Sequence, residues 1–391
     1  MKLLHVVDTL ARNGRTILLQ DLIRSMNSSV EHLVVTLMDT GPMTNRFSEM
    51  GIEVHALNVY SPFRGFRKKW KVISRIFHFQ PNVCLCWSGV ANISSTILRL
   101  FGIPVIWTLH NSTVRWNTFK TRYGVRLAAL LSKIVPERII CCSNMTYDVY
   151  RDIHRFRENR LLVIANGVDV TRFRPNRNER ERIRKEQGIS DSALVVATAA
   201  RIELPGSRYI QGDFKDLETL FKAAAITSQK KQDIYYLLFG SNINDENEQL
   251  VDWLRRYKLQ ENVKLLGFQN NVAALYAASD IYALSSTTGE GLPVSLIEAM
   301  ACGAIPVCTD SGDIRAVVGP AGIVVPQKDA VKLATAILDI AELSESQRDK
   351  YSKNAVEIVK YFYNIELVAR RYSDILVQVI TGSTNGSSKH K

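Results

Sequence analysis

Two glutamates, Glu290 and Glu298, are the residues of this chain whose type and spacing best fit a chemical role. The first is followed by residues typical of a turn and of a helix start: Gly291, Leu292, Pro293 and Val294. This pattern predicts a loop at Glu290 and a short helix that contains Glu298. The first N–H groups of a helix lack intrahelical partners and favour anions. Carboxylates accept hydrogen bonds from hydroxyls, so the segment suits a nucleotide diphosphate sugar.

Two basic side chains and one histidine lie at the ends of strand-like segments. Arg201 follows the apolar run 194–200, and Lys215 precedes a helix-like run. Cations beside a diphosphate leaving group stabilise the charge that develops as a glycosidic bond breaks. His110 follows the strand-like run 104–109 in the first half of the chain.

In this order, these residues resemble the signature of retaining glycosyltransferases of family 4, which have the GT-B fold. The resemblance implies that Glu290 contacts the donor sugar and that Glu298 contacts the ribose. It also implies that Arg201 and Lys215 hold the donor diphosphate, and that His110 lies beside the donor sugar. The predicted catalytic residues are therefore His110, Arg201, Lys215 and Glu290.

The chain departs from the family pattern at two places. The spacer between Arg201 and Lys215 is longer than usual, which leaves Arg208 as an alternative to Lys215. The Gly-rich first loop, which closes over the phosphates in the family, retains only Gly14. Asn13 is expected to replace the second glycine, because asparagine tolerates positive φ. The implied donor-binding residues are Gly14, Phe268, Gly291, Leu292, Pro293, Val294 and Glu298.

The length and periodicity of the chain predict two α/β domains. The 391 residues exceed one ordinary core. Strand-like and helix-like runs alternate throughout, which is typical of doubly wound parallel sheets. We therefore predict two Rossmann-like domains that face each other across a cleft, as in GT-B proteins. The first, at 1–170, is the acceptor domain, and a helix near 365–380 packs back on it. The second, at 171–364, binds the nucleotide sugar, and 381–391 is a disordered tail.

Positive charge is concentrated in the first domain. The net charge is +12, and residues 54–136 contain no acidic residue. This distribution predicts an anionic partner, which is a membrane surface, a phosphorylated acceptor or nucleic acid. Apolar residues recur at helical spacing there, and they form either the buried face of a Rossmann helix or an interfacial segment: Phe63, Phe66, Trp70, Ile73 and Phe77. A second such segment contains Trp116, Phe119 and Tyr123.

Several classes of protein are disfavoured by the sequence. No apolar run is long enough to span a membrane, and no signal peptide is recognisable. The six cysteines match no metal template, which favours a reduced, cytoplasmic protein. No Asp-x-Asp pair occurs, so we expect a metal-independent reaction with no cofactor beyond the donor. No nucleic-acid-binding motif is present, although the charge leaves that class as a rival.

The sequence thus predicts a retaining transferase that moves a hexosyl unit from a nucleotide diphosphate sugar, with UDP favoured over GDP. The acceptor is expected to be a saccharide or a polyprenyl-diphosphate-linked saccharide in surface polysaccharide or glycoconjugate synthesis. We expect the protein at the inner face of the membrane. An enzyme of the same fold with other chemistry, such as an epimerase, is the alternative.

Overall fold

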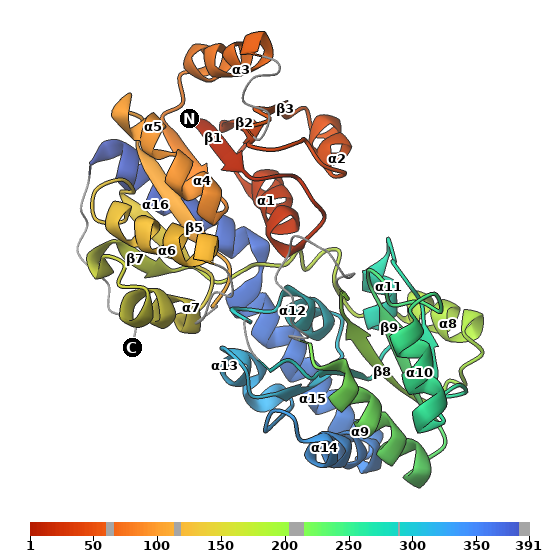
Figure 1. Cartoon of the computed structure of the whole chain (residues 1–391). Coiled ribbons are helices and arrows are strands. Elements are labelled where there is room, and N and C mark those ends of the chain that lie inside the picture. Colours follow the sequence, from red (N-terminus) through yellow and green to blue (C-terminus); the bar gives the residue numbers. More distant parts are fainter. Residues whose placement is uncertain (60–65, 113–118, 203–214, 288–289, 383–391) are drawn as a thin grey trace. The chain divides into compact units, whose positions relative to one another are not determined.

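The chain forms two compact units, and each is built on its own parallel sheet (Figure 1). The computed structural model describes residues 1–59, 66–112, 119–202, 215–287 and 290–382. The first unit comprises Met1–Gly167 and Ile365–Lys391, and the second comprises Val168–Asn364. The first boundary lies between Gly167 and Val168, slightly before the predicted residue 170.

The first unit contains a seven-stranded sheet in the order β3-β2-β1-β4-β5-β6-β7. Its strands are β1 (Lys2–Val7), β2 (Glu31–Thr36), β3 (Glu53–Ala56), β4 (Val83–Cys86), β5 (Val105–Leu109), β6 (Arg138–Cys141) and β7 (Leu161–Val163). Side chains alternate between the two faces, so Leu3 and Val7 pack in one core and Leu4 and Val6 in the other. Both faces are apolar because helices cover both of them.

The last helix of the chain covers one face of this sheet. α16 (Ile365–Thr381) packs beside α1 (Gly14–Ser25) and against β4. Its Val368, Tyr372 and Leu376 are buried in the same core as β1, and α2 (Thr44–Glu49) adds Phe47. The helix extends through Thr381, so the predicted start of the disordered tail at 381 is wrong. Residues 383–391 lie outside the described residues.

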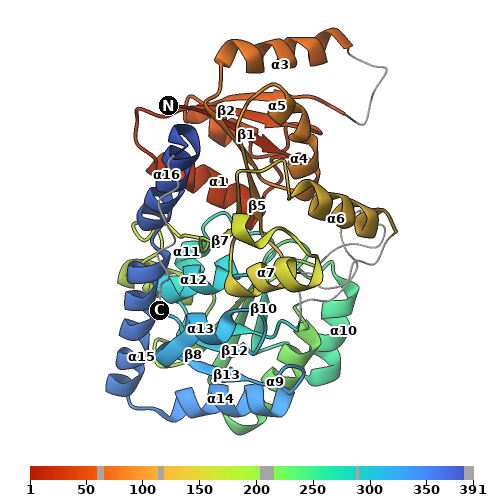
Figure 2. The same ribbon diagram turned by 90° about the vertical axis from the view of Figure 1, so that its left-hand side faces the viewer.

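The opposite face is covered by α3 (Phe66–Phe79), α4 (Gly89–Ser94), α5 (Thr96–Leu100), α6 (Phe119–Leu131) and α7 (Asn144–Asp148) (Figure 2). α3 buries Val72, Ile76 and Phe79 against this sheet. These residues form a second stripe at helical spacing, offset from the predicted one. The alternative in which the predicted stripe is the buried face is therefore wrong, because Trp70, Ile73 and Phe77 are exposed.

Some of the predicted interfacial residues cannot be placed. Phe63 and Trp116 lie outside the described residues, and so does Arg208. The side chains of Phe66 and Phe119 are likewise outside them.

The second unit contains a six-stranded sheet in the order β10-β9-β8-β11-β12-β13. Its strands are β8 (Leu194–Ala199), β9 (Ile234–Phe239), β10 (Val263–Leu265), β11 (Ile281–Leu284), β12 (Ile305–Thr309) and β13 (Ile323–Val325). α9 (Leu217–Lys230), α10 (Glu248–Tyr257) and α14 (Ala330–Glu342) contribute to one core with these strands. The remaining helices are α8 (Arg177–Glu186), α11 (Val272–Ala277), α12 (Val294–Ala301), α13 (Ile314–Val318) and α15 (Glu345–Ile358).

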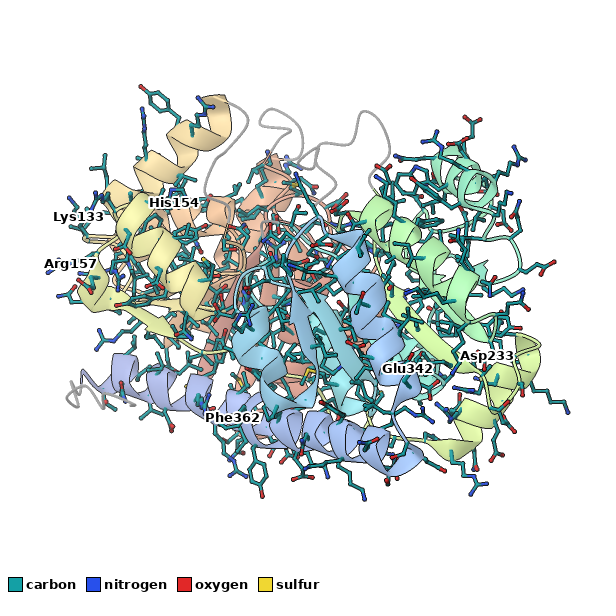
Figure 3. The ribbon with its side chains drawn as sticks, turned by 90° about the horizontal axis from the view of Figure 1, so that it is seen from below. Lys133, His154, Arg157, Asp233, Glu342 and Phe362 are labelled. Carbon is teal, nitrogen blue, oxygen red and sulfur yellow. The ribbon has the colours of Figure 1, made fainter. Side chains whose placement is uncertain are left out.

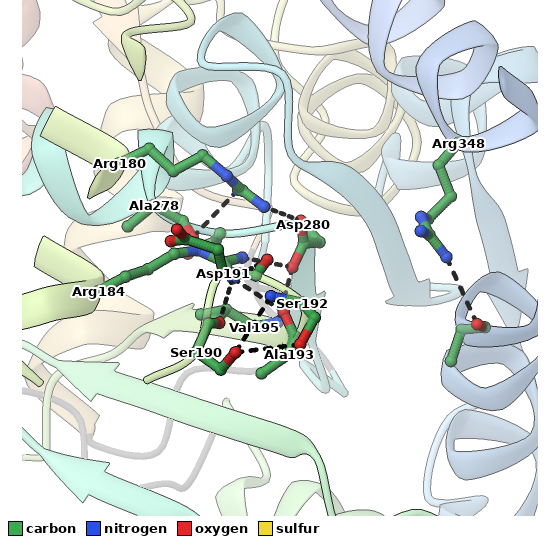
Figure 4. A network of polar contacts seen from close by, with 12 residues as sticks. Arg180, Arg184, Ser190, Asp191, Ser192, Ala193, Val195, Ala278, Asp280 and Arg348 are labelled. Carbon is green, nitrogen blue, oxygen red and sulfur yellow. Dashed lines mark hydrogen bonds and ion pairs between the residues drawn. The ribbon is translucent and has the colours of Figure 1, made fainter. Parts of the chain in front are cut away.

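A buried arginine fixes α8 to the start of this sheet (Figure 4). Arg184 is 1% exposed and donates to Asp280 Oδ2 at 2.7 Å and to the Ala193 carbonyl at 2.8 Å. Asp280 also accepts from Arg180 at 2.6 Å and from the Val195 N–H at 2.7 Å. The buried charges are thus paired and hydrogen-bonded, as a low-polarity interior requires.

The chain passes from one unit to the other twice, and the two connecting segments pair with each other. Val168 donates its N–H to the Tyr363 carbonyl at 2.8 Å and pairs with Asn364. A Cβ added at Gly167 would lie 3.0 Å from the Cα of Ile365, so this approach favours glycine. In the described residues, no helix is long and apolar enough to cross a membrane.

Candidate active site

The switch point of the second sheet brings two predicted site residues together. The strand order reverses between β8 and β11. In doubly wound sheets, ligands bind outside the carboxyl ends of the strands at such a point. Arg201 follows β8 and Glu290 follows β11 along the chain. Both predicted residues therefore lie at the edge of the sheet where a ligand is expected.

Glu290 is held by a lysine and a serine. Lys215 Nζ donates to Glu290 Oε1 at 2.5 Å, and Ser286 Oγ donates to the same oxygen at 2.9 Å. Ser285 Oγ donates to the backbone carbonyl of Lys215 at 2.6 Å. The sequence assigned Lys215 to the diphosphate and Glu290 to the sugar, and the structure places the two side chains in contact. Ser285 and Ser286 were missed, although a serine pair directly after a buried strand was the available signal.

A glycine from the next loop supports the backbone at Glu290. Gly312 has φ +59°, and a Cβ added there would lie 2.4 Å from the Glu290 carbonyl oxygen. Both the positive φ and the close approach require glycine at this position. The loop after β12 therefore sets the position of the loop that carries Glu290.

Glu298 lies inside α12 and is only 7% exposed. The hydroxyl of Tyr276 donates to Glu298 Oε2 at 3.3 Å. Burial, followed by the nearby Glu298 carboxylate, raises the pKa of Tyr276 well above its usual value, so this hydroxyl stays protonated and donates. Tyr276 lies on α11, and nothing in the sequence pattern marked it as a partner of Glu298.

The start of α12 offers backbone donors. Pro293 is the N-cap residue, and no side-chain hydrogen bond caps the helix. Within the described residues, the N–H groups of Val294 and Ser295 thus lie at an uncapped helix start, where an anion is favoured. Gly291 and Leu292 are buried beside it. This matches the predicted arrangement of the segment.

Arg201 follows β8 and Phe268 follows β10, so both lie at the carboxyl edge of the second sheet. Arg201 is exposed, and the carbonyl of the next residue, Ile202, accepts from Asn242 Nδ2 at 2.6 Å. Phe268 is 52% exposed and follows Gly267, which has φ +63°. An exposed ring at the carboxyl end of β10 can stack on a nucleobase.

His110 lies at the corresponding edge of the first sheet. It follows β5, and Trp87 follows the neighbouring strand β4. The two rings stack with 5.6 Å between centroids and 9° between planes. His110 Nε2 lies 3.0 Å from Thr108 Oγ1. Burial, and then the positive charge of Arg15, lower the pKa of His110 to about 3. His110 is therefore neutral near pH 7.

Trp87 is itself fixed by two residues that the sequence analysis missed. Its Nε1 donates to His5 Nδ1 at 3.2 Å, and its ring also stacks on Tyr372 of α16 with centroids 6.2 Å apart. Since His5 Nδ1 accepts this bond, the neutral ring donates from Nε2 to His32 Nδ1, at 3.0 Å. Strand β1 and the last helix thus hold Trp87 in place, and Trp87 in turn supports His110.

The first loop differs from the prediction. Asn13 has φ −149°, so the expected positive φ is wrong. Asn13 instead is the N-cap of α1, and its side chain accepts from the Thr16 N–H at 3.0 Å. Gly14 is the first residue of that helix. The following Arg15 donates to Asp8 at the end of β1, so this helix start is anchored to the strand.

No group of three histidine, cysteine or acidic side chains that could hold a metal ion occurs among the residues that the structure describes.

Comparison with known proteins supports a glycosyltransferase. The family "Glycosyl transferases group 1" matches residues 207–357, and "Glycosyltransferase Family 4" matches residues 12–172. The two matches cover both units of the structure. The chain belongs to the family 4, group 1 glycosyltransferases.

Two curated relatives and one solved structure illustrate the likeness. The chain is 26% identical over 226 residues to the putative colanic acid biosynthesis glycosyltransferase WcaL of Escherichia coli, covering 56% of this chain and 51% of the relative. It is 31% identical over 192 residues to the GDP-mannose-dependent monoacylated alpha-(1-6)-phosphatidylinositol monomannoside mannosyltransferase of Corynebacterium glutamicum, covering 46% of each. The chain spans about half the length of these relatives.

The solved structure is that of Anabaena HepE in complex with UDP-glucose. It superimposes with a TM-score of 0.81 at 19% identity, covering 97% of this chain and 100% of that chain. The likeness extends over both units and confirms the predicted GT-B fold class.

Proposed function

We propose that this protein transfers a hexosyl unit from a UDP-sugar to a saccharide acceptor with retention of configuration. One observation carries the proposal. Glu290 lies at the switch point of the second sheet in contact with Lys215, and the buried Glu298 lies in the helix that follows. In this proposal Glu290 contacts the donor sugar, Lys215 the phosphate and Glu298 the ribose, and all three residues belong to the second unit. The UDP-glucose bound to HepE supports the choice of base.

The proposed reaction breaks the bond between the sugar C1 and the β-phosphate oxygen. The acceptor oxygen forms its bond to C1 on the same face of the sugar. The acceptor proton passes to the leaving phosphate, so no protein nucleophile is needed. Arg201 and Lys215 would compensate the charge on that phosphate. Lys215 would then leave Glu290, whose carboxylate becomes available to the sugar hydroxyls.

His110 has a different role in this proposal. Its neutral imidazole can donate one hydrogen bond and accept another, which suits a donor-sugar hydroxyl. We therefore propose that His110 orients the donor sugar and does not act as a proton donor to the leaving group.

The acceptor is proposed to be a lipid-linked saccharide in the synthesis of a surface polysaccharide or glycoconjugate. The names of WcaL and of the phosphatidylinositol mannoside mannosyltransferase support these two parts of the proposal. The first unit would meet this acceptor at an anionic membrane surface on the cytoplasmic side, consistent with its charge. The reaction is proposed to need no metal.

Differential scanning with UDP, GDP, ADP and TDP tests the donor. A ligand at 100 times its Kd stabilises the folded state by about 2.7 kcal/mol, so the preferred base gives the largest rise in Tm. Turnover of the matching sugar donors in excess EDTA then tests the chemistry. A rise in Tm with GDP alone would contradict the proposal that the donor nucleotide is UDP. Conversion of the sugar donor in the absence of an acceptor would indicate an epimerase.

A further inference from the structure

Large apolar side chains are exposed along two neighbouring helices of the first unit. Among the described residues, Trp70 is 63% exposed on α3, and Leu100 and Phe101, at the end of α5, are 81% and 64% exposed. We call the following set the docking ridge: Trp70, Ile73, Phe77, Ile97, Leu100 and Phe101. Single exposed apolar residues are ordinary, but a contiguous group marks an interaction site.

The six residues form one continuous surface. Trp70, Ile73 and Phe77 recur at spacings of three and four, so they lie on one side of α3. Ile97, Leu100 and Phe101 do the same on α5. The rings of Phe77 and Phe101 meet edge to face with 5.0 Å between centroids, which joins the two sides. Figure 2 shows α3 and α5 beside each other.

The fold of the first unit does not require this ridge. α3 buries Val72, Ile76 and Phe79 in the core of this unit, and none of the ridge residues belongs to that core. The ridge lies on the outer side of the same helix, where polar residues are expected in a surface helix. Its exposed apolar area is therefore available for a contact outside the chain.

Charge complementarity identifies the kind of surface that the ridge contacts. Arg67 and Lys71 are exposed on α3 beside the ridge, and no acidic residue occurs from 54 to 136. Not every cation of this segment contributes, because Arg75 is paired with Glu53 at 2.8 Å. Arg99 is likewise paired with Glu137 at 2.7 Å.

Helix α6 carries a similar arrangement of exposed apolar and basic side chains. Tyr123, Leu127, Leu130 and Ile134 are exposed at helical spacing on α6 and the turn after it. Arg126 and Lys133 are exposed beside them, and Figure 3 shows the Lys133 side chain pointing outward. α6 packs against α4, which directly precedes α5 in the chain.

We infer that the docking ridge inserts shallowly into an anionic lipid surface. Trp70 and Phe101 would lie at the boundary between headgroups and acyl chains, and Arg67 and Lys71 would contact lipid phosphates. A ridge of amphipathic and apolar side chains flanked by long cations fits a bilayer, whose charge is spread evenly, better than one acidic protein groove. The inference rests on the proposed function only for its purpose, which is to bring the chain to a lipid-linked acceptor.

Flotation of the full chain with vesicles tests the inference. Binding is expected to phosphatidylglycerol–phosphatidylcholine vesicles and not to phosphatidylcholine alone, with release as salt rises. Trp70→Ser should lower the ratio of bound to free protein by about tenfold, since each large apolar side chain contributes over 1 kcal/mol. Val331→Ser is the matched control, because Val331 is also 63% exposed but lies on α14 of the second unit.

Two charge-reversal variants distinguish an effect of charge at the docking ridge from an effect of the net charge of the chain. Lys71→Glu and Lys353→Glu each change the net charge from +12 to +10. Both lysines are exposed, but Lys353 lies on α15 of the second unit. Only Lys71→Glu should weaken vesicle binding, by about fivefold or more. Equal losses of vesicle binding in the two variants would show a non-specific charge effect and contradict the inference that the docking ridge contacts the lipid surface.

Other outcomes identify a different occupant. Absence of flotation by the wild-type chain on acidic vesicles at low salt would overturn the inference. Light scattering that shows a dimer dissociated by Trp70→Ser, without flotation, would assign the ridge to a second copy of the chain. The rise in Tm with UDP is measured in every variant. A chain that floats but does not respond to UDP would contradict the proposed function and leave the docking ridge intact.

Discussion

The indole of Trp87 lies parallel to the imidazole of His110, with 5.6 Å between ring centroids and 9° between their planes. His5 accepts a hydrogen bond from the indole N–H, and the Tyr372 ring stacks on the indole. The orientation of His110 is therefore set by a strand at the centre of the sheet and by the last helix of the chain. This support connects the C-terminal helix to the proposed donor-sugar contact.

We predict that Trp87→Leu lowers kcat for sugar transfer about 10- to 100-fold, because misplacement of a positioning group has effects of that size. Trp87→Phe keeps a stacked ring but loses the bond to His5, so its loss should be smaller. Trp107→Phe is the control, since Trp107 is equally buried and donates to Ser95 at 2.9 Å on the other face of the sheet. The Tm rise with UDP should remain unchanged in all three, and an unchanged kcat in Trp87→Leu would remove the stack from the mechanism.

The two glutamates should divide the donor between them. Glu298→Gln should weaken the binding of free UDP. Glu290→Gln should leave the affinity for free UDP unchanged and weaken the binding of the UDP-sugar. Tyr276→Phe removes the hydroxyl that donates to Glu298, at a cost of about 0.5 to 1.5 kcal/mol, so UDP should bind several-fold more weakly. Tyr236→Phe is the control, because its buried hydroxyl bonds Thr227 at 2.7 Å in the core. Calorimetry that finds equal UDP affinity in Glu290→Gln and Glu298→Gln would contradict the division of roles.

The glycine behind Glu290 should be required for turnover. Gly312→Ala introduces a Cβ at 2.4 Å from the Glu290 carbonyl oxygen, so the loop that carries Glu290 must move. Activity should fall by more than tenfold, consistent with the effect of small displacements at a reacting centre. Gly188→Ala provides the control, since Gly188 also has positive φ, +68°, but no atom lies within 4 Å of the added Cβ. If both variants lose only about 1 kcal/mol of stability and retain turnover, the close approach has no catalytic consequence.

Arg184 should be the most sensitive ionic position of the second unit. Arg184→Met leaves the partly buried Asp280 with fewer donors, and we expect a loss of about 3 kcal/mol in the free energy of unfolding. Arg182, on the same helix, is 46% exposed in its ion pairs with Glu179 and Glu186. Its replacement by methionine should cost much less, because exposed ion pairs contribute little to stability. Denaturant titration of the two variants measures the difference, and equal losses would contradict the contrast.

Three histidines should make the first unit sensitive to acid. Burial lowers the pKa of His5 well below its usual value, and that of His32 to about 4. Burial lowers the pKa of His110 to about 3. A histidine whose folded pKa lies below its unfolded value of about 6.5 favours folding when neutral, so this stability is lost as pH falls below that value.

The Tm should therefore fall between pH 7.5 and 5. His32→Gln should remove part of this dependence, about 1 kcal/mol over that interval after allowance for its partial exposure. His78→Gln, at an exposed position of α3, should not change it. A wild-type Tm that is independent of pH would contradict the expected neutral state of the buried histidines.

Much of the fold and part of the site follow from local patterns. The alternation of strands and helices predicted both parallel sheets, because the apolar periodicity of each element is a property of consecutive residues. The segment from Glu290 to Glu298 was likewise placed correctly as a loop followed by a helix. Arg201 follows β8 and His110 follows β5, so each residue lies at the carboxyl edge of its sheet, whatever the rest of the chain does.

Only the tertiary structure decided the contacts between distant residues. α3 carries two apolar stripes, and packing against the sheet selected Val72, Ile76 and Phe79 over Trp70, Ile73 and Phe77. Trp87 and His5 are 82 positions apart, and Tyr276 is 22 positions from Glu298. No periodicity relates such pairs, since their approach depends on strand order and on which helices pack together. The sequence determined which elements form and which chemistry they carry, and the packing of those elements determined what surrounds each site residue and which apolar face remained exposed.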